Sequence, residues 1–485
     1  MARPAVNSDN VLTALDSQAP TAMYWQLTLL ATLGGFLFGY DTSNIGSALN
    51  FVPYHLQGLA MGYLVSGASL GAAAGAILGG PLADRFGRKK LLIVDAAIYA
   101  IGAILSAVTP DAAVLLIART FIGVAVGADS AIATAYIAEF APKNKRGSLS
   151  MLQQWMITVG ILVAYLVALV IFAAFPHSAA SVGWRLVLGL GAVPALIGLA
   201  LRTSMPESPR WLLRQGKYEE VAKAVAALGA GDVSVEDIKS GAAAIEATET
   251  SRKGRSHGWT PAAKRALIVV CVFFVFQQIT GINVPLYYGP HLLGATFSGP
   301  HASLVATTVA GVEVTAIMTL FNVGFTYLGF RWIDKFGRRK LAIGGYVGMI
   351  VFAAISAVGL MALQGTTSMV VIMIGLCGFI SSFAVGVGGT GWTLQGEVFP
   401  TAVRGQAAAI AAFVDWIANF ALVEVFPVWQ KGIGLGGVML CFAALCAMAI
   451  AFIFFSLPET KGLGVEEIVE LFDKNKPTSA PASAG

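Results

Sequence analysis

The segment Asp84-Arg-Phe-Gly-Arg-Lys-Lys90 returns in the second half of the chain as Asp334-Lys-Phe-Gly-Arg-Arg-Lys340. Two shorter motifs recur with a similar offset, close to 250 positions. Motifs that recur in the same order predict two similar halves arranged in parallel. The first of these motifs is Glu139, Pro142, Arg146 and Gly147, recurring as Glu397, Pro400, Arg404 and Gly405, and the second is Pro206-Glu-Ser208, recurring as Pro458-Glu-Thr460.

The residues between these motifs are too apolar for a chain surrounded by water. Of 485 residues, 56% are hydrophobic and 12% are charged, and the mean hydropathy is +0.75. Twelve apolar stretches are long enough to cross a hydrocarbon core of roughly 30 Å, which takes about 20 helical residues. The sequence therefore predicts an all-α membrane protein in a lipid bilayer. The predicted spans are residues 24–47, 59–83, 90–108, 112–138, 151–175, 185–202, 264–289, 303–331, 341–363, 367–396, 404–428 and 434–457.

Clusters of basic residues fall in alternate loops between the predicted spans. The opposite loops, at 50–58, 175–183 and 291–303, contain no Lys or Arg. Because cytoplasmic loops carry the excess of Lys and Arg, both termini are expected in the cytoplasm. The chain has no Asn-x-Ser/Thr acceptor, which favours a bacterial cytoplasmic membrane, and its formal charge of +5 belongs to these loops and indicates no nucleic-acid partner. The clusters are Arg85, Arg88, Lys89 and Lys90; Lys143, Lys145 and Arg146; and Lys335, Arg338, Arg339 and Lys340.

One long polar insertion separates the sixth and seventh spans. Its residues 218–228 predict a helix with Val221, Val225 and Leu228 on one face, and its residues 251–258 predict a loop. A lid or brace at the cytoplasmic mouth is the expected role. The predicted organisation is a cytoplasmic tail at 1–22, six-helix bundles at 23–204 and 263–458, this insertion at 205–262, and a cytoplasmic tail at 459–485.

Neither a metal centre nor an enzyme active site is indicated. The cysteines lie inside apolar runs and the histidines fall in predicted loops, both without paired ligand spacing. The sequence also lacks a Gly-rich phosphate loop and a nucleophile elbow. We therefore expect no catalytic residue, no metal and no cofactor. The residues concerned are Cys271, Cys377, Cys441, Cys446, His55, His177, His257, His291 and His301.

Six motifs occur in order over nearly the whole chain. They are Gly35-Phe-Leu-Phe-Gly-Tyr-Asp41, Gly80-Pro-Leu-Ala-Asp-Arg-Phe-Gly-Arg88, Arg119 with Gly123 and Gly127, Pro206-Glu-Ser-Pro-Arg-Trp211, Gln277-Gln278 with Gly281 and Asn283, and Pro458-Glu-Thr-Lys-Gly462. In this combination they resemble the sugar porters of the major facilitator superfamily. The resemblance implies twelve helices in two pseudo-symmetric six-helix bundles. It also implies alternating access to a monosaccharide or polyol bound between the halves, by facilitated diffusion or with a proton.

Asp41 places a carboxylate inside the first predicted span, and Arg119 lies in the fourth. A charge in hydrocarbon is costly unless it is paired, protonated or functional, so we expect these two side chains to pair. The arginine favours the ionised acid and burial favours the neutral acid, which would allow Asp41 to load and release a proton. Proton-coupled members of the family carry Asp at this position, so the resemblance implies proton coupling. A purely structural ion pair is the alternative.

Polar and aromatic residues within the apolar spans are candidates for sugar contacts. A side-chain amide offers a donor and an acceptor to vicinal hydroxyls, and a Trp face covers the apolar side of a pyranose. Hydrogen bonding between helices is the alternative for any single amide. Gly281 and Pro285 are expected to break the seventh helix and to create a movable gate with Tyr287 and Tyr288. The positions that match sugar contacts in the family are Gln154, Gln277, Gln278, Asn283, Tyr287, Asn322 and Trp392.

The sequence departs from the family pattern in two places. Before Trp392 it reads Gly386-Val-Gly-Gly-Thr-Gly391 in place of a proline-rich segment, which leaves the geometry of the gate open. Asp415 stands beside Trp416 where the family usually has an amide, and we count both among the substrate contacts. Acids within spans have three open roles: extra proton sites, recognition of a cationic or amino-bearing solute, and exposure to a watery cavity. The other acids of this kind are Asp129, Glu313 and Glu424.

A set of charged residues at the cytoplasmic ends of the spans is expected to form the inner gate. We predict ion pairs between the two halves that close this gate and break when the protein opens inward. The same residues also serve as orientation signals. The set is Asp84, Arg88, Glu139, Arg146, Asp334, Arg338, Glu397 and Arg404.

The sequence as a whole predicts a proton-coupled symporter of a monosaccharide or polyol that functions as a monomer. The alternatives are a facilitative sugar uniporter, a proton-coupled transporter of another small metabolite, and a nutrient sensor. The sensor is disfavoured because the tail after Leu471 is short. The particular sugar is not readable, because a single hydroxyl is discriminated by the shape of the cavity and not by the set of amides.

Overall fold

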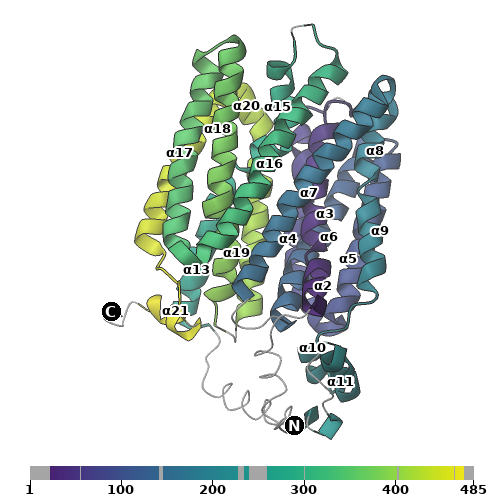
Figure 1. Ribbon diagram of the computed structural model, residues 1–485, viewed down its shortest axis with the longest axis vertical. Helices are drawn as coiled ribbons and strands as arrows, with labels where there is room; N and C mark the ends of the chain where they lie inside the picture. The colour runs from purple at the N-terminus through teal and green to yellow at the C-terminus, as the bar shows by residue number, and fades with distance from the viewer. Residues whose placement is uncertain are drawn as a thin grey trace.

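The computed structural model describes residues 22–54, 56–140, 146–227, 234–236, 238–239, 259–299, 301–400, 403–463 and 465–473. Within these residues the regular elements are all helices, and the long ones run side by side (Figure 1). We call the end of the bundle that carries Arg85 and Lys335 the basic end, and the end that carries Asn50 and His291 the opposite end.

The first half of the chain contributes six spans. The first span is divided at Thr32, and the sixth begins with short turns. Its elements are α2 (Ala22–Ala31), α3 (Leu33–Ala48), α4 (Leu59–Phe86), α5 (Arg88–Val108), α6 (Ala112–Phe140), α7 (Arg146–Ala174), η2 (Pro176–Ser178), η3 (Ala179–Gly183), α8 (Trp184–Gly189) and α9 (Ala192–Arg202).

The second half contributes six more spans, two of which are broken. The helix α20 holds the last two spans, since Gly434 has non-helical φ and ψ of 71° and 163° within it. The elements are α13 (Pro261–Ile279), α14 (Asn283–Tyr287), α15 (Gly289–Phe297), α16 (Leu304–Phe336), α17 (Arg338–Ala362), α18 (Gly365–Phe383), η4 (Ala384–Gly388), α19 (Gly389–Glu397) and α20 (Arg404–Ser456).

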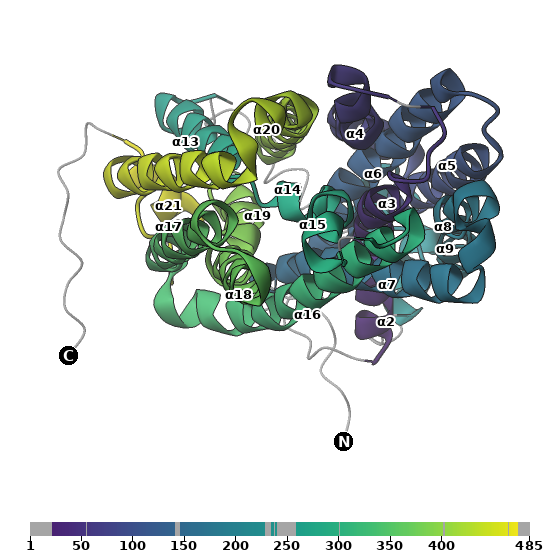
Figure 2. The same ribbon diagram turned by 90° about the horizontal axis from the view of Figure 1, so that it is seen from above.

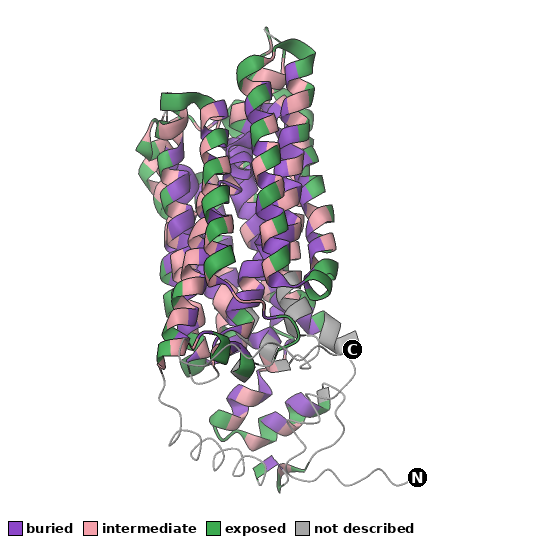
Figure 3. Ribbon diagram, turned by 90° about the vertical axis from the view of Figure 1, so that its left-hand side faces the viewer, coloured by how far each residue is buried: buried purple, intermediate pink, exposed green. Residues whose placement is uncertain are grey.

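Ten stretches of the described residues are long and apolar enough to cross a membrane. The helix α20 counts once among them although it holds two spans, and α2 with α3 forms a further span that is broken at Thr32. All twelve predicted spans are therefore helical where the structure describes them. Exposed residues lie on the outward faces of the helices (Figure 3). They include large apolar side chains, with Ile117 68% exposed and Phe455 83% exposed, as contact with lipid requires. The prediction of an all-α membrane protein is confirmed.

The helices extend further at the basic end than the sequence predicted. The basic clusters around Arg88 and Arg338 were expected in loops, but Arg85 and Lys335 end α4 and α16, and the other residues of the clusters begin α5 and α17. A single glycine separates the two helices in each half. That glycine has a positive φ, 99° at Gly87, which a residue with a Cβ adopts only with strain. The loop prediction was wrong because hydropathy marks the edge of the membrane and not the end of a helix.

The recurring motifs act on one another in each half. Glu207 accepts hydrogen bonds from the backbone N–H groups of Arg88 and Lys89, at 3.0 and 3.2 Å. In the second half Glu459 caps α17 in the same way, at 2.9 and 3.2 Å. An acid at a helix N-terminus satisfies unpaired N–H groups and complements the helix dipole. The Pro-Glu-Ser and Pro-Glu-Thr motifs thus recur because each fixes the start of a helix at the basic end.

The two halves lie beside each other, as the view from above shows (Figure 2). The helices of the first half gather on one side and α13, α17, α18 and α20 on the other, with α14, α15 and α16 between them. The halves meet where α4 packs against α20 and where α7 packs against α16. This arrangement places residues from both halves around a shared centre.

Part of the polar insertion forms two short helices, α10 (Pro209–Arg214) and α11 (Tyr218–Ala227), below the bundle at the basic end (Figure 1). Val221 and Val225 are buried against a cluster that includes Trp211, so the predicted helical face is confirmed. Leu228 and the predicted loop at 251–258 lie outside the described residues. A further short helix, α21 (Val465–Leu471), follows the last span.

Candidate functional site

The seventh span is broken in the middle, as the sequence predicted. Helix α13 ends at Ile279, α14 begins at Asn283, and Gly281 between them has a φ of 90°. A Cβ on Gly281 would lie 2.2 Å from Phe442 Cε2, so only glycine fits at this position. The break turns the chain so that amides on either side of it face each other.

A chain of hydrogen bonds crosses this break. The Nδ2 of Asn283 donates to Gln278 Oε1 at 2.7 Å, and the Nε2 of Gln278 donates to Asp415 Oδ1 at 2.7 Å. Asp415 is only 2% exposed, so its carboxylate is shielded from water and is held by the Gln278 amide. The chain fixes which way each amide points, because Gln278 has to donate to the acid and accept from Asn283.

The glycine-rich segment of the tenth span makes room for the side-chain amide of Gln277. Its Nε2 donates to the carbonyl of Gly388 at 3.1 Å, and its Oε1 lies where a Cβ on Gly391 would be only 2.3 Å away. Gly388 ends the π-helical segment η4, in which a carbonyl is left free to accept a side-chain bond. The segment therefore serves the close approach of an amide, a role that the sequence had left open.

Three buried polar atoms around these amides have no hydrogen-bond partner in the part of the chain that the structure describes. They are Gln277 Oε1, Trp416 Nε1 and Asn419 Oδ1. Asn419 was missed at the sequence level, although it lies one helical turn beyond Asp415 on the same face of α20. Its Nδ2 donates to the Tyr287 hydroxyl at 3.3 Å, which connects Tyr287 to the same group.

A small cavity of about 30 Å³ joins residues of both halves. Gln154 of α7 lines it from the first half, and Trp392 and Trp416 line it from the second. The ring of Trp416 packs edge-on against Phe38 of α3 with centroids 4.8 Å apart. These three predicted contacts are thus brought together, in a space that holds about one water molecule.

Asn322 is the one predicted contact that the structure ties to its own helix. Thr326 donates to the backbone carbonyl of Asn322 at 2.7 Å and approaches its side-chain oxygen at 3.4 Å. Asn322 is 4% exposed. Its neighbour Val323 accepts a bond from Trp155 Nε1 at 3.3 Å, which joins α16 to α7 at this level.

Contacts between the halves seal the opposite end. Asn50 donates to Thr308 at 3.0 Å, and Ser66 donates to Glu424 Oε2 at 2.7 Å. Gly62 lies against the Glu424 carbonyl so closely that a Cβ would come within 2.2 Å. Glu424 is therefore an inter-half contact in this conformation.

The two tyrosines of the predicted gate are both engaged. Tyr288 donates to the carbonyl of Val423 at 2.9 Å, and a Cβ on Gly46 would lie 2.4 Å from the carbonyl oxygen of Tyr287. Tyr165 of the first half donates to the Leu286 carbonyl. The segment that follows the break in the seventh span is thus held against both halves, which is the position a gate requires.

The predicted pair of Asp41 and Arg119 is confirmed. Arg119 Nη1 donates to Asp41 Oδ1, and both residues are buried, at 1% and 3% exposed. The guanidinium also donates through Nε to the carbonyl of Leu64 at 3.4 Å. The pair joins α3 to α6 within the first half, beside the gate residues of α14.

A second buried ion pair was missed at the sequence level. Arg202 Nη2 lies 2.7 Å from Asp129 Oδ1, and the same guanidinium donates to the carbonyl of Leu92 at 2.7 Å. Asp95 is also buried, and its Oδ2 has no partner among the described residues. Of the three roles left open for Asp129, exposure to a watery cavity does not hold in this conformation, because its carboxylate packs against Gly34 and the residue is 3% exposed. The sequence signal that could have predicted this ion pair is the presence of an ionisable residue in each of three apolar spans.

Arg88 and Arg338, two arginines of the charged set at the basic end, each form ion pairs inside their own half. Arg88 contacts Asp84 at 2.7 Å and Glu139 at 2.9 Å. In the second half Arg338 contacts Asp334 at 2.9 Å and Glu397 at 2.6 Å. The predicted pairs between the halves therefore do not involve these two arginines in this conformation.

Two residues of that set and one further acid complete the predicted positions. Arg404 donates through Nε to the carbonyl of Phe399 at 3.2 Å, and the side chain of Arg146 lies outside the described residues. Glu313 is exposed on α16.

Known proteins resemble this chain over nearly its whole length. A sequence profile of the family described as "Sugar (and other) transporter" matches residues 27–472. The arabinose-proton symporter of Bacillus subtilis is 33% identical and aligns over 92% of this chain and 95% of its own length. The glucose transporter GlcP of Staphylococcus epidermidis is 36% identical over 91% and 95%. The D-xylose-proton symporter of Escherichia coli is 31% identical over 95% and 98%.

Solved structures show the same fold. The xylose transporter XylE of Escherichia coli, in a partially occluded inward open conformation, superposes with a TM-score of 0.78 at 28% identity, covering 91% of this chain and all of that one. A structure of XylE, a major facilitator superfamily proton:xylose symporter, bound to 6-bromo-6-deoxy-D-glucose superposes with a TM-score of 0.77 at 29% identity, over 94% and 100%. The chain therefore belongs to the sugar transporter family of the major facilitator superfamily, and it is a multi-pass membrane transporter and not an enzyme.

Proposed function

We propose that the protein carries a monosaccharide or polyol, together with a proton, across a bacterial cytoplasmic membrane by alternating access. The relatives named for arabinose-proton and xylose-proton symport support this substrate class. The basic end would face the cytoplasm, since cytoplasmic loops carry the excess of Lys and Arg. Both termini would then be cytoplasmic, and the protein would function as a monomer of two bundles, 23–204 and 263–458, with the insertion 205–262 between them.

The observation that carries the substrate assignment is the group of unpartnered polar atoms at the centre. Gln277 Oε1, Trp416 Nε1 and Asn419 Oδ1 provide two acceptors and one donor in a buried site. A buried polar atom without a partner costs about 1–3 kcal/mol. Sugar hydroxyls both donate and accept, so a bound sugar would pair all three atoms and recover that cost. Gln154, Gln278, Asn283, Tyr287, Asn322, Trp392 and Asp415 are the further proposed contacts.

The proton would be carried by Asp41. Arg119 is its partner in this conformation, and both side chains are shielded from water. A buried acid with a single cationic partner changes its protonation state when water enters or when the partner moves. The pair lies beside the gate segment α14, so sealing and opening of that segment would control access of water to Asp41.

The switch would proceed by rocking of one half against the other. The opposite end is sealed by inter-half contacts such as that of Ser66 with Glu424, so this conformation would open toward the basic end. The set formed by Asp84, Arg88, Glu139, Arg146, Asp334, Arg338, Glu397 and Arg404 is proposed to close the basic end in the other state.

Transport by the purified protein in liposomes tests the proposal. Uptake of labelled hexoses and pentoses would be followed with and without an inward proton gradient, for the unmodified protein and for Asp41→Asn. We expect gradient-driven accumulation in the unmodified protein. Asp41→Asn should lose accumulation and keep sugar exchange, because exchange needs binding and rocking but no net proton movement. Glu313→Gln, which removes an exposed acid of a span, is the matched control and should accumulate sugar normally.

The other outcomes distinguish the alternatives. Equilibration that ignores the gradient would identify a uniporter and leave Asp41 as a structural partner of Arg119. Movement of no sugar under any gradient would refute the substrate class. A panel of other metabolites, including amino-bearing ones that Asp415 would attract, would then identify the solute. Failure with every solute would favour a nutrient sensor.

A further inference from the structure

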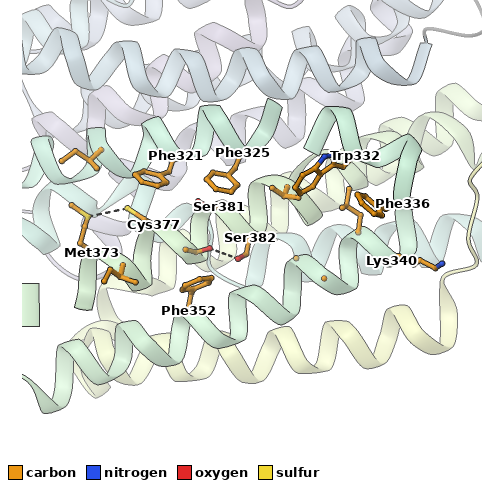
Figure 4. Close-up of a pocket in the computed structure, with 17 residues that line it drawn as sticks. Phe321, Phe325, Trp332, Phe336, Lys340, Phe352, Met373, Cys377, Ser381 and Ser382 are labelled. Carbon is orange, nitrogen blue, oxygen red and sulfur yellow. Dashed lines mark hydrogen bonds between the residues drawn. The ribbon is translucent and has the colours of Figure 1, made fainter. Parts of the chain in front are cut away.

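A groove of about 750 Å³ lies between α16, α17 and α18, away from the central amides (Figure 4). Its walls are aromatic and aliphatic, and several are open to the surroundings, with Phe321 43% exposed and Ile374 53% exposed. The aromatic walls are formed by Phe321, Phe325, Trp332, Phe336 and Phe352, and Lys340 lies at one end. In a membrane-spanning protein such a groove is exposed to lipid and not to water.

Glycines create the hollow. A Cβ on Gly344 would meet no atom within 4 Å, so the space beside this residue is open. A Cβ on Gly378 would lie 2.2 Å from the ring of Phe352, which closes the groove where α17 and α18 meet. Phe321 and Phe325 stack at 6.3 Å on the α16 side, and Figure 4 shows them facing the groove across from Phe352.

Two of the three walls of the groove have the length of about one leaflet of a bilayer, and the α16 wall is longer. On α17 the groove runs from Lys340 to Phe352, and on α18 and η4 from Met373 to Val385. On α16 it runs from Ile317 to Phe336, a rise of about 28 Å. Twelve residues of helix rise about 18 Å. Half of a hydrocarbon core of about 30 Å is about 15 Å. Where α17 faces α18 and η4, the groove therefore extends from the basic end to about the middle of the membrane, which is the length of one acyl chain.

The charge of the groove lies at its rim. Lys340 is exposed at the basic end and is the one charged residue among the lining residues. Figure 4 places it beyond Trp332 and Phe336, at one end of the row of aromatic rings. A lysine at this depth extends its ammonium to the headgroup level, and a Trp at the same level is typical of membrane interfaces. An apolar trough with a cation at its headgroup end complements a lipid with an anionic headgroup.

We propose that the groove binds an anionic phospholipid of the leaflet at the basic end, with its phosphate beside Lys340 and one acyl chain along α17 and α18. The acyl chain would lie against Val385 of η4, whose Gly388 carbonyl accepts the Gln277 bond. The site would thus place a lipid against the segment that positions a central amide.

Photolabelling of the protein in vesicles tests the site. The vesicles would contain phosphatidylcholine with a trace of either phosphatidylglycerol or phosphatidylcholine that carries a diazirine midway along one acyl chain. We expect the phosphatidylglycerol probe to label peptides of α17 and α18 about fivefold more than the phosphatidylcholine probe, since one lysine near the surface is worth that factor. Lys340→Gln should remove this preference, and Gly344→Phe should suppress labelling of the groove by both probes.

The repeat supplies matched controls. Lys90 and Val94 occupy the positions of Lys340 and Gly344 in the first copy of the motif, and neither lines the groove. Lys90→Gln and Val94→Phe should leave the labelling of α17 and α18 unchanged. Val94 is 46% exposed. Equal labelling by the two probes in the unmodified protein would overturn the anionic specificity. Groove labelling that survives Gly344→Phe would overturn the binding site, and the Lys340→Gln comparison decides the headgroup contact should Gly344→Phe fail to fold.

Discussion

Replacement of Arg202 by methionine should destabilise the protein more than any other single removal of a basic side chain outside the Asp41 and Arg119 pair. Arg202 is 0% exposed and connects four helices. It contacts Asp129 of α6 at 2.7 Å, donates to Leu92 of α5 at 2.7 Å, and donates to Leu30 of α2 at 3.4 Å. Methionine keeps much of the volume and removes the charge and every donor.

The magnitude follows from what the substitution leaves behind. Removing one partner of a buried ion pair costs about 3–5 kcal/mol, because the other charge stays buried without compensation. Asp129 would then lose the guanidinium that it contacts at 2.7 Å, in a region where Asp95 is buried as a second acid. The double variant Asp129→Asn with Arg202→Met removes one of those acids, so a coupling energy of about 1–3 kcal/mol should be recovered.

Unfolding in mixed micelles by titration with dodecyl sulfate, followed by tryptophan fluorescence, measures these free energies if it is reversible. The exposed pair of Lys217 and Glu220, 3.1 Å apart and 47% and 53% exposed, provides the control. Lys217→Met should cost less than about 1 kcal/mol. The reasoning would be refuted if Arg202→Met lowered the free energy of unfolding by no more than Lys217→Met does. It would also be refuted if the double variant lost more free energy of unfolding than the two single variants lose together.

Two further predictions concern the break in the seventh span and the seal at the opposite end. Gly281→Ala should lower the melting temperature and reduce the free energy of unfolding by more than about 1 kcal/mol, because the φ of Gly281 is 90° and the new Cβ would meet Phe442 at 2.2 Å. As the control, Gly432→Ala places a Cβ that meets no atom within 4 Å, so it should be neutral or stabilising. Equal melting temperatures for the two variants would contradict the strain at Gly281. Glu424→Ala should open the opposite end, because it removes the hydrogen bond from Ser66, and a hydrogen bond to a charged group is worth about 1.5–3 kcal/mol. Deuterium exchange of backbone amides should then rise in residues 59–66 and not in residues 88–95. Unchanged exchange in both segments would show that the contact between Ser66 and Glu424 does not hold the seal.

The features that the sequence predicted are those that a single segment determines. The seventh helix is broken at Gly281 as expected, with Pro285 inside the short helix that follows, because the backbone conformation at a glycine is local. The pair of Asp41 and Arg119 was predictable because each is an isolated charge in its span and needs a partner. The twelve spans followed from hydropathy alone.

The features that escaped prediction depend on how helices are rotated against each other. The role of Asp129 was left open among three alternatives, and the rotation of α6 turns it toward Arg202 and Gly34. Asn419 carries no family motif, and only the packing of α20 against α14 shows that it reaches Tyr287. The glycines before Trp392 suggested flexibility, whereas they accommodate the Gln277 amide on η4. To predict each of these contacts, one has to know the rotation of a helix about its own axis, and hydropathy does not determine this rotation when all faces of the helix are apolar.

The two halves are alike at their basic ends and different at mid-membrane, and this difference constrains any coupling between proton and solute. The offset that relates Glu139 to Glu397 relates Arg119 to Cys377, so the second half has no counterpart of that arginine. The amide group, conversely, lies on α13, α14 and α20 of the second half. On the proposed roles, the proton and most of the solute contacts therefore belong to different bundles. Coupling has to pass through the surface where they meet, at the packing of Phe38 on Trp416 and of Gly46 on the Tyr287 carbonyl. A rigid-body switch would break both contacts together, which is how two separate sites can be opened by one motion.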